Sequence, residues 1–212
     1  MQEGKNRDKT MEQKEYFDNA AKTWDQKFLT PKLSAFLEKL VPQFKLEKGQ
    51  KILDVGTGTG VLIPYLSKAV GPEGSVTAVD FSENMAQIAK AKHLHLKNVT
   101  VKVANIQETT FPAETFDAVI CFGVFPHLEN KQKVLQNINK MLKPNGTLVI
   151  SHALSSEELK VHHKKVSEKM AHALLPEPAD MTKLLEQNGF KNISIKDEPG
   201  CYLCIAYKSV RT

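Results

Sequence analysis

The residues best suited to chemistry form a short glycine-rich stretch, LDVGTGTG, about a quarter of the way along the chain. Glycine at every second position predicts a tight loop whose backbone can approach a bound cofactor closely. The dinucleotide fingerprint G-x-G-x-x-G requires a glycine where this chain has Val61. A nucleotide-like cofactor other than a dinucleotide is therefore favoured. The candidate binding residues of this stretch are Asp54, Gly56, Thr57, Gly58 and Gly60.

Two carboxylates next to this loop indicate which cofactor it binds. Asp54 directly precedes the glycines, where a negative charge would repel a pyrophosphate. It suits a ligand with an ammonium group and a sulfonium, and S-adenosylmethionine (SAM) has both and lacks phosphate. Asp80 ends the next apolar run, 24 residues after Gly56, near the ~20-residue offset at which an acidic side chain meets a ribose diol. Asp80 is therefore predicted to bind the ribose hydroxyls.

The elements that must position these residues alternate between strands and helices. Two amphipathic helices come first, over residues 11–28 and from Pro31 to near Pro42. Strands are expected at 51–55, 75–80, 99–104, 116–122 and 147–153, and helices at 60–70, 82–93, 131–142, 155–175 and 178–189. Ser82 is a plausible N-cap, and a KPNG turn is expected to precede the fifth strand. This alternation predicts an α/β fold with a doubly wound sheet and helices on both faces.

The end of the chain predicts a hairpin. FKNISIKDEPGCYLCIAYK contains two strand-like runs that are separated only by a few residues around Pro199 and Gly200. Parallel strands need a crossover of a dozen or more residues, so these two strands must be antiparallel. A mostly parallel sheet with an antiparallel strand at its end differs from a typical dinucleotide-binding fold.

The glycine loop, Asp80 and the hairpin together resemble the class I SAM-dependent methyltransferases, and the resemblance covers nearly the whole chain. The nearest group is the small-molecule type that includes the ubiquinone and menaquinone biosynthesis methyltransferases. The resemblance implies a Rossmann-like, doubly wound seven-stranded sheet, mostly parallel with an antiparallel C-terminal hairpin strand. It also implies one methyltransferase domain over residues 1–212. N-terminal cap helices would occupy 1–45, the SAM-binding core 46–212, and a helical lid insertion the region near 153–177.

The resemblance further implies which residues meet the cofactor. EYFDNAAKTWDQ is similar to the family's cap helix, in which an aromatic residue closes over SAM, so Tyr16 and Trp24 are candidates. Phe81 follows the ribose acid and would pack on the adenine. The remaining candidates are Met85 beside Phe81, Asn105 and Ile106 at the end of the third strand, and Cys121, Phe122 and Gly123 near the methionine part of SAM. Asn105 stands where the family usually has an aspartate, and its carbonyl oxygen can accept the same bond from the adenine amino group.

The loop after the fourth strand bears on the methyl acceptor. CFGVFPHLEN has one proline and no Asn or Asp at the point where the N/D-P-P-Y/F motif of adenine and amide methyltransferases would lie. It therefore favours a compact hydrophobic or polarizable acceptor, with Phe125 as an apolar wall. His127 follows, and a histidine at this edge of the sheet is a candidate general base. It could equally bond backbone groups or cap the next helix.

Further histidines lie near the tip of the fifth strand and on the helix after it. His152 is a second tentative catalytic residue, and His162, His163 and His172 follow it. This set is compatible with a proton-transfer network, a divalent metal site of neutral imidazoles, or a solvated face rich in Lys and His. His93 and His95 are expected at a surface helix end.

Composition limits the classes of protein that need to be considered. The net charge of +5 over 212 residues has no long basic block, so no nucleic-acid partner is expected. No apolar run approaches the ~18 residues of a membrane span, and the N-terminus does not look like a secretory signal, so a cytoplasmic protein is expected. Cys201 and Cys204 lie on one strand, where residues three apart point to opposite faces. Their C-x-x-C spacing therefore indicates small buried residues more than a redox or metal pair.

These features predict transfer of a methyl group from SAM to a small-molecule acceptor, with S-adenosylhomocysteine (SAH) as the other product. The acceptor atom would be a phenol or enol oxygen or carbon, or a thiol. Alternatives are a SAM-binding protein without methyl transfer, a methyltransferase acting on protein or RNA, and an NAD-dependent oxidoreductase. Val61, Asp54 and the terminal hairpin count against the last of these. A monomer or a homodimer is expected.

Overall fold

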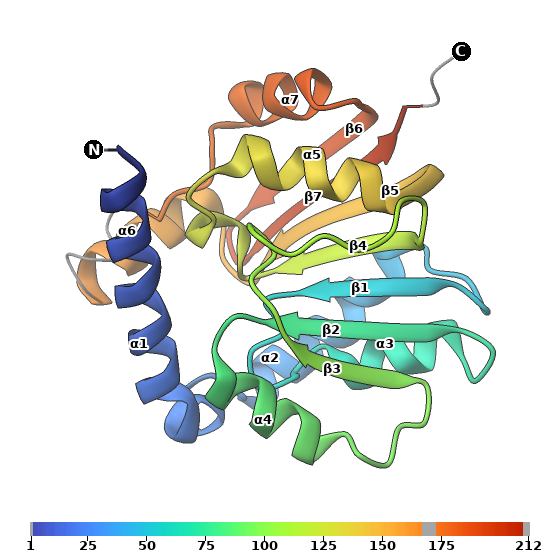
Figure 1. Ribbon diagram of the computed structural model, residues 1–212, viewed down its shortest axis with the longest axis horizontal. Helices are drawn as coiled ribbons and strands as arrows, with labels where there is room; N and C mark the ends of the chain where they lie inside the picture. Colours follow the sequence, from blue (N-terminus) through green and yellow to red (C-terminus); the bar gives the residue numbers. More distant parts are fainter. Residues whose placement is uncertain (1, 167–172, 210–212) are drawn as a thin grey trace. The chain divides into compact units, whose positions relative to one another are not determined.

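The computed structural model describes residues 2–166 and 173–209, with side chains for 11–164 and 173–209. It divides into two compact units, residues 1–109 and 110–212, which are described in turn (Figure 1). The organisation of the whole chain as one methyltransferase domain stays a prediction. Part of the expected lid region, residues 167–172 with His172, lies outside the described residues.

The first unit carries three parallel strands in the order β3-β2-β1. Its elements are α1 (Gln2–Phe28), α2 (Pro31–Leu40), the 3₁₀ turn η1 (Val41–Phe44), β1 (Lys51–Val55), α3 (Ile63–Val70), β2 (Ser75–Asp80), α4 (Glu83–Lys92) and β3 (Val99–Val103). β1 and β2 are buried along most of their length, as expected for parallel strands covered on both faces. Parallel strands place Asp54 and Asp80 near the same edge, because the carboxyl ends of β1 and β2 meet there.

Local capping explains where the helices of this unit begin. The Thr30 hydroxyl accepts a hydrogen bond from the Leu33 amide at 3.2 Å, and Pro31 occupies the first helical turn of α2. The Ser82 hydroxyl accepts from the Met85 amide at 3.2 Å, which confirms Ser82 as the N-cap of α4. The cap fixes α4 directly after Asp80.

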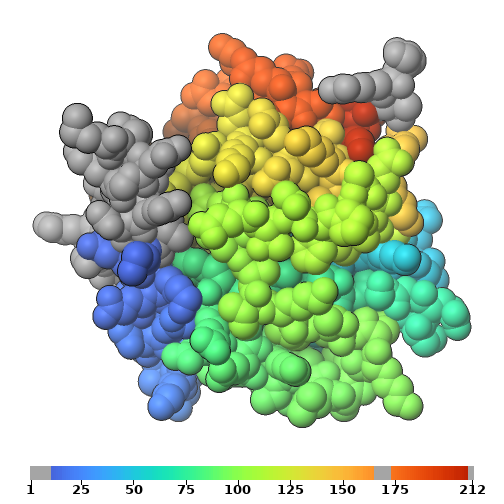
Figure 2. Space-filling view, viewed as in Figure 1, coloured from blue at the N-terminus to red at the C-terminus, as the bar shows by residue number. Residues whose placement is uncertain are grey.

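The long helix α1 lies beyond the carboxyl ends of β1 and β2 (Figure 1). The space-filling view shows its side chains from residue 11 onward lying against those of α4 (Figure 2). α1 therefore lies close to the loops that follow both strands, where the candidate cofactor residues are.

The second unit carries four strands in the order β4-β5-β7-β6. Its elements are β4 (Phe116–Phe122), the 3₁₀ turn η2 (Phe125–His127), α5 (Lys131–Met141), β5 (Leu142–His152), α6 (Ser156–Val166), α7 (Pro178–Gln187), β6 (Phe190–Glu198) and β7 (Cys201–Lys208). β4 and β5 are parallel, and β7 is antiparallel to both β5 and β6. The terminal hairpin is confirmed, with Pro199 and Gly200 forming its turn.

Across the described residues, the strands are mostly parallel with an antiparallel C-terminal pair, and helices flank them. The Rossmann-like, doubly wound fold class is therefore confirmed. Cys204 is buried as expected, whereas Cys201, three residues away on β7, is only half-buried.

β5 begins earlier than the sequence predicts. Residues 143–146, expected as a turn before the strand, lie within Leu142–His152. The pairing steps from Phe116↔Leu142 to Ala118↔Thr147, so β5 has extra residues opposite β4. Asn145 takes the left-handed conformation, with φ 59°, inside this bulge. The turn residues bend the strand without ending it.

The start of α6 is tied to the terminal hairpin. Ser155 and Glu158 form a reciprocal capping box, because each side chain accepts a hydrogen bond from the other residue's amide. The Asp197 carboxylate of β6 accepts from both the amide and the hydroxyl of Ser156. Glu158 also accepts from the amide of Gly200 at 2.7 Å. The expected helix over 155–175 is shorter at its C-terminal side, because residues 173–177 are not helical.

Removing the Asp197 carboxylate tests how strongly the hairpin holds α6. We expect Asp197→Ala to lower the free energy of unfolding by about 1–2 kcal/mol, because two donors at the start of α6 lose their acceptor. Glu198→Ala is the matched control, since it removes only an exposed ion pair with Lys196, worth less than about 1 kcal/mol. Urea unfolding followed by circular dichroism measures both, and equal losses would contradict the assignment.

Candidate active site

The glycine loop begins at the end of β1 and is held by β2. The amides of Gly56 and Thr57 both donate to the carbonyl oxygen of Val79, at 2.8 and 3.0 Å. Gly56, Gly58 and Gly60 have φ values of 68°, 56° and 83°. Each of the three glycines is therefore left-handed, a conformation that costs other residues about 1–2 kcal/mol. This explains why glycine occupies every second position.

Asp80 connects the glycine loop to the start of α4. One carboxylate oxygen accepts from the Gly58 amide at 2.8 Å, and the other accepts from the Ser82 amide at 2.9 Å. The side chain is 6% exposed, and burial raises the pKa of Asp80 to about 6 although these amide bonds oppose the rise. Asp80 therefore lies at the strand tip that the sequence predicts, and its carboxylate contacts the glycine loop.

Asp54 is buried next to the same loop. It is 1% exposed, and its Oδ2 atom has no hydrogen-bond partner among the described residues. Burial raises the pKa of Asp54 to about 7, the neighbouring Thr57 side chain lowers it, and the charge of Asp80 raises it further. With its pKa raised this far, the carboxyl group can take up a proton near neutral pH.

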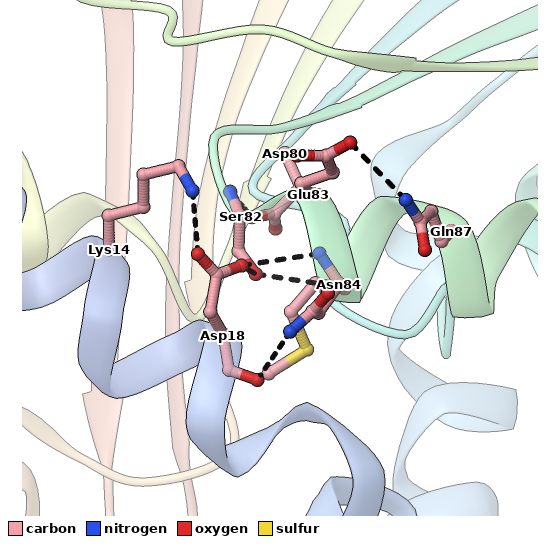
Figure 3. A network of polar contacts seen from close by, with 8 residues as sticks. Lys14, Asp18, Asp80, Ser82, Glu83, Asn84 and Gln87 are labelled. Atoms are coloured by element: carbon pink, nitrogen blue, oxygen red, sulfur yellow. Dashed lines mark hydrogen bonds and ion pairs between the residues drawn. The ribbon is translucent and has the colours of Figure 1, made fainter.

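Asp18 of α1 holds the segment that follows Asp80 (Figure 3). Its Oδ1 atom accepts from the Ser82 hydroxyl at 2.6 Å and from the Asn84 amide at 3.2 Å. Lys14 donates to Oδ2 at 2.6 Å. Burial alone would raise the pKa of Asp18, but these hydrogen bonds lower it below its usual value. Asp18 thus stays ionised and ties α1 to the N-terminus of α4.

Asp25, two turns further along α1, holds the glycine loop itself. It accepts from the Thr59 hydroxyl at 2.5 Å and from Lys92 at 2.6 Å. Burial would raise the pKa of Asp25, yet the hydrogen bonds from Lys92 and Thr59 lower it. The sequence interpretation missed Asp18 and Asp25. A signal exists in their seven-residue spacing, which places both on one side of a helix.

Aromatic side chains of α1 lie next to the same loops. Phe17 packs edge-on against Phe81, with ring centroids 5.9 Å apart. The Trp24 indole nitrogen is 4.0 Å from the position that a Cβ atom on Gly58 would take. Tyr16 packs against Phe17 and is partly exposed. Trp24 therefore meets the loop directly, and Tyr16 lies at the rim of the aromatic group.

The expected adenine-side residues of the first unit also surround the end of β2. The Ala104 amide donates to the Asp80 carbonyl oxygen at 2.8 Å, which places Asn105 and Ile106 after it. The Asn105 side-chain oxygen accepts from the Gln107 amide at 3.0 Å. Met85 is fully buried and Ile106 nearly so. The oxygen that was expected to meet the adenine thus closes a local turn.

The expectation that His93 lies at the surface is wrong, whereas His95 is exposed as expected. His93 is 8% exposed, and a Cβ atom on Gly60 would lie 2.8 Å from its ring. Burial lowers the pKa of His93. Helical periodicity places His93 at a helix end, which is where it lies, but its ring packs against Gly60 of the glycine loop.

In the second unit, the residues expected near the methionine part of SAM end β4. Cys121 is fully buried, and Phe122 is half-buried. Gly123 has φ 71° and its amide donates to the Ser151 carbonyl oxygen at 2.8 Å. A Cβ atom on Gly123 would meet nothing within 4 Å, so the space beside this backbone is open.

The histidines of the second unit form a cluster. The rings of His127 and His163 lie 5.2 Å apart, and those of His162 and His163 lie 6.0 Å apart. Burial, aided by the neighbouring histidines, lowers the pKa of His127 to about 3 and that of His152 to about 4. Both rings are neutral at physiological pH.

The sequence left three interpretations of this cluster: a solvated face, a metal site and a proton-transfer network. His163 is 6% exposed, so a solvated face does not describe it. In the part of the chain that the structure describes, no group of three or more His, Cys, Asp or Glu side chains is arranged to hold a metal ion. The proton-transfer network stays a prediction.

Comparison with known proteins also indicates a methyltransferase. Residues 46–196 match the model of a family described as a methyltransferase domain. The demethylmenaquinone methyltransferase of Staphylococcus aureus is 39% identical over 113 residues, which are 53% of this chain and 46% of the relative. This chain thus matches about half the length of that curated relative.

Two solved structures extend the comparison. A SAM-dependent methyltransferase from Aquifex aeolicus is 30% identical, with a TM-score of 0.68 over 81% of this chain and 89% of that one. Phosphoethanolamine N-methyltransferase 2 of Haemonchus contortus, in complex with phosphomonomethylethanolamine and SAH, shares the fold at 18% identity. Its TM-score is 0.74 over 91% of this chain and 58% of that one.

The helices of the described region include none that is both long enough and apolar enough to cross a bilayer. α1 is the longest of them, and it is rich in charged side chains.

Two glycines with nearly the same φ allow the loop contact with His93 to be tested. Gly49→Ala should lower the free energy of unfolding by about 1–2 kcal/mol, because φ is 82° but nothing lies within 4 Å of the new Cβ. Gly60→Ala, at φ 83°, should cost a further 1–3 kcal/mol or so, since the His93 ring must move. Denaturant unfolding of the two variants measures both losses in unfolding free energy. Equal losses would show that the His93 ring moves aside without cost.

Replacing Asp54 should stabilise the protein at alkaline pH. Because the folded pKa is about 7 and the ordinary value is 3.8, the folded state disfavours the charged form. We expect Asp54→Asn to raise the free energy of unfolding at pH 8 by on the order of 2–4 kcal/mol. The gain should shrink as the pH falls below about 7 and vanish only below about 3, where Asp54 is protonated in both the folded and the unfolded state.

The control for this comparison is Glu38→Gln, which changes an exposed carboxylate on α2. Thermal unfolding of each variant against wild type across that pH range is the measurement. A gain that stays constant with pH would overturn the assignment of a buried, protonatable Asp54.

Proposed function

We propose that this chain, which belongs to the family of SAM-dependent methyltransferase domains, transfers the methyl group of SAM to a small-molecule acceptor and releases SAH. The observation that carries the proposal is the placement of Asp80. Its carboxylate lies at the tip of β2 and is bonded to the amide of Gly58, in the glycine loop. In this arrangement the carboxylate can bond a ribose diol, and the backbone of the glycine loop can lie along the rest of the ligand.

The first unit would hold the adenosine part of SAM. Asp80 would accept from the ribose hydroxyls, and the loop residues Gly56, Thr57, Gly58 and Gly60 would lie along the ligand. Phe81, Met85, Asn105 and Ile106 would meet the adenine, and Tyr16 and Trp24 of α1 would cover it. In the second unit, Cys121, Phe122 and Gly123 remain the candidates for the methionine part.

Asp54 suits the cationic part of the cofactor. A carboxyl group with a pKa near 7 becomes fully ionised when an ammonium group binds beside it. Burial strengthens that attraction, because little water screens it. This residue therefore supports a positively charged cofactor over a phosphate-bearing one.

The chemistry asked of the protein is positioning and desolvation. The SAM sulfur is a good leaving group, so the acceptor atom displaces it in line at the methyl carbon. Nothing in this displacement requires a metal ion. The divalent metal considered from the sequence is not part of the proposal.

The acceptor that fits best is a phenol, an enol, or a thiol of modest size. The demethylmenaquinone methyltransferase relative supports a small-molecule acceptor. In the second unit, Phe125 begins the turn that carries His127 and is wholly buried. His127 and His152 are the tentative acceptor-side residues. Cytoplasmic location and action as a monomer or homodimer, without nucleic acid, stay predictions from the sequence.

Replacing the ribose-binding carboxylate tests the cofactor. SAH should raise the melting temperature of wild type, because it binds the folded state alone. Asp80→Asn should weaken SAH binding about 10–100-fold, since a charged acceptor for two hydroxyls is lost. Wild-type affinity should also fall as the pH drops below about 6, where Asp80 takes up a proton.

Isothermal titration with SAH measures these affinities, and Glu83→Gln is the control because this nearby carboxylate is exposed. An unchanged affinity in Asp80→Asn would remove the ribose assignment. Incubation with methyl-labelled SAM and a panel of phenols, enols and thiols then tests transfer. Label found in protein or RNA alone would contradict a small-molecule acceptor.

A further inference from the structure

His163 has a hydrogen bond that fixes which of its ring nitrogens carries the proton. Its Nδ1 atom lies 2.6 Å from the carbonyl oxygen of Ala173. A carbonyl oxygen only accepts, so Nδ1 must be the donor and carry hydrogen. In the neutral ring the Nε2 atom therefore has the free lone pair. Such a backbone bond orients an imidazole and makes the opposite nitrogen a proton acceptor.

Three elements surround the His163 ring with groups that act on it. His127 comes from the turn after β4, His152 from the tip of β5, and His162 from α6 itself. Lys131, at the start of α5, acts on His127 and donates to the carbonyl oxygens of Pro126 and Leu128, at 3.2 and 2.8 Å. These groups are neutral or positive and favour a negative charge that forms among them, whereas the Glu129 carboxylate, two residues after His127 and with a buried Oε1 atom, opposes it.

Two buried polar groups on one face of this sheet lack partners. His152 and Tyr202 are paired directly across β5 and β7, so their side chains share a face. The Nδ1 atom of His152 and the hydroxyl oxygen of Tyr202 make no hydrogen bond within the described part of the chain. Tyr202 is wholly buried. Buried polar groups are rarely left unmet, so these atoms indicate a polar ligand or ordered water.

The histidines of the cluster differ in their suitability as a base. Burial and like-charged neighbours hold the pKa of His127 near 3 and that of His152 near 4, so both are weak proton acceptors. Burial also lowers the pKa of His163, but its bond to the Ala173 carbonyl opposes the change. His127 and His152 are then better suited to bonding the acceptor than to taking its proton.

We propose that the Nε2 atom of His163 accepts the proton of a phenol or enol hydroxyl on the methyl acceptor, which His127 and His152 bind beside it. This rests on the proposed function. The acceptor's O–H bond breaks, and its proton forms an N–H bond on His163. The oxygen, or the carbon conjugated with it, then bonds to the methyl carbon of SAM. The C–S bond breaks and its electron pair stays on sulfur, giving SAH.

A carbon acceptor regains its conjugated ring by losing its own proton to solvent. The proposal names a weakly acidic hydroxyl because the surrounding charge favours an acceptor that becomes an anion. An amine that becomes a cation would be disfavoured by Lys131 and by a protonated His163.

A chromophoric phenol tests the proposal without turnover. 4-Nitrophenol is titrated with the full-length protein, with and without SAH, and its phenolate absorbance is followed. Bound to wild type, it should ionise at a pH about one unit below that of the free probe. His163→Asn should abolish this shift, because the asparagine amide can keep the bond to the Ala173 carbonyl while Nε2 is lost.

Controls separate this role from a structural one. His163→Asn should keep the wild-type melting temperature, His163→Gln should lose the shift as well, and exposed His95→Asn should keep it. No saturable binding of the phenol, or a wild-type shift in His163→Asn, overturns the proposal. Ionisation of an aromatic thiol but not of the phenol overturns the hydroxyl class. SAH binding is scored separately, so a protein that ionises the phenol but ignores SAH loses the proposed function alone.

Discussion

The two amide hydrogen bonds accepted by Asp80 are the contacts on which the cofactor half of the structure depends. One comes from Gly58 in the glycine loop, and the other from Ser82 at the start of α4. A single carboxylate at the tip of β2 thus sets the position of the loop after β1 and of the helix after β2. Because it is buried, these bonds compensate part of the cost of keeping a carboxylate out of water.

Helix α1 holds the same two segments from outside. Asp18 bonds the Ser82 side and Asp25 bonds Thr59 in the glycine loop. The pKa values of these outer carboxyl groups are lowered, whereas those of Asp54 and Asp80 are raised. The outer pair therefore carries permanent charge and fixes the structure. The inner pair, with raised pKa values, can take up or release a proton near neutral pH.

Much of this arrangement could be predicted from the sequence, because it follows local rules. Strand and helix periodicity, the glycine spacing, the Ser82 cap and the terminal hairpin each depend on residues close together in the chain. The roles of Asp18 and Asp25 could not be predicted, since their partners lie 64 and 34 residues away. The burial of His93 could not be predicted for the same reason. Periodicity predicts a helix end, but the residues that cover it are set by tertiary packing.

Both sets of ionisable groups share one physical property, which is that burial makes them more neutral than they would be in water. In the first unit it raises the pKa values of two carboxyl groups, and in the second it lowers those of His127, His152 and His163. Under the proposed function, the cationic SAM would restore charge to the carboxylates, and an acidic acceptor would give its proton to an imidazole. Each ligand would thereby carry a charge opposite to that of the residues around it. Binding and proton movement are then linked, as they must be wherever a ligand changes the pKa of a buried group.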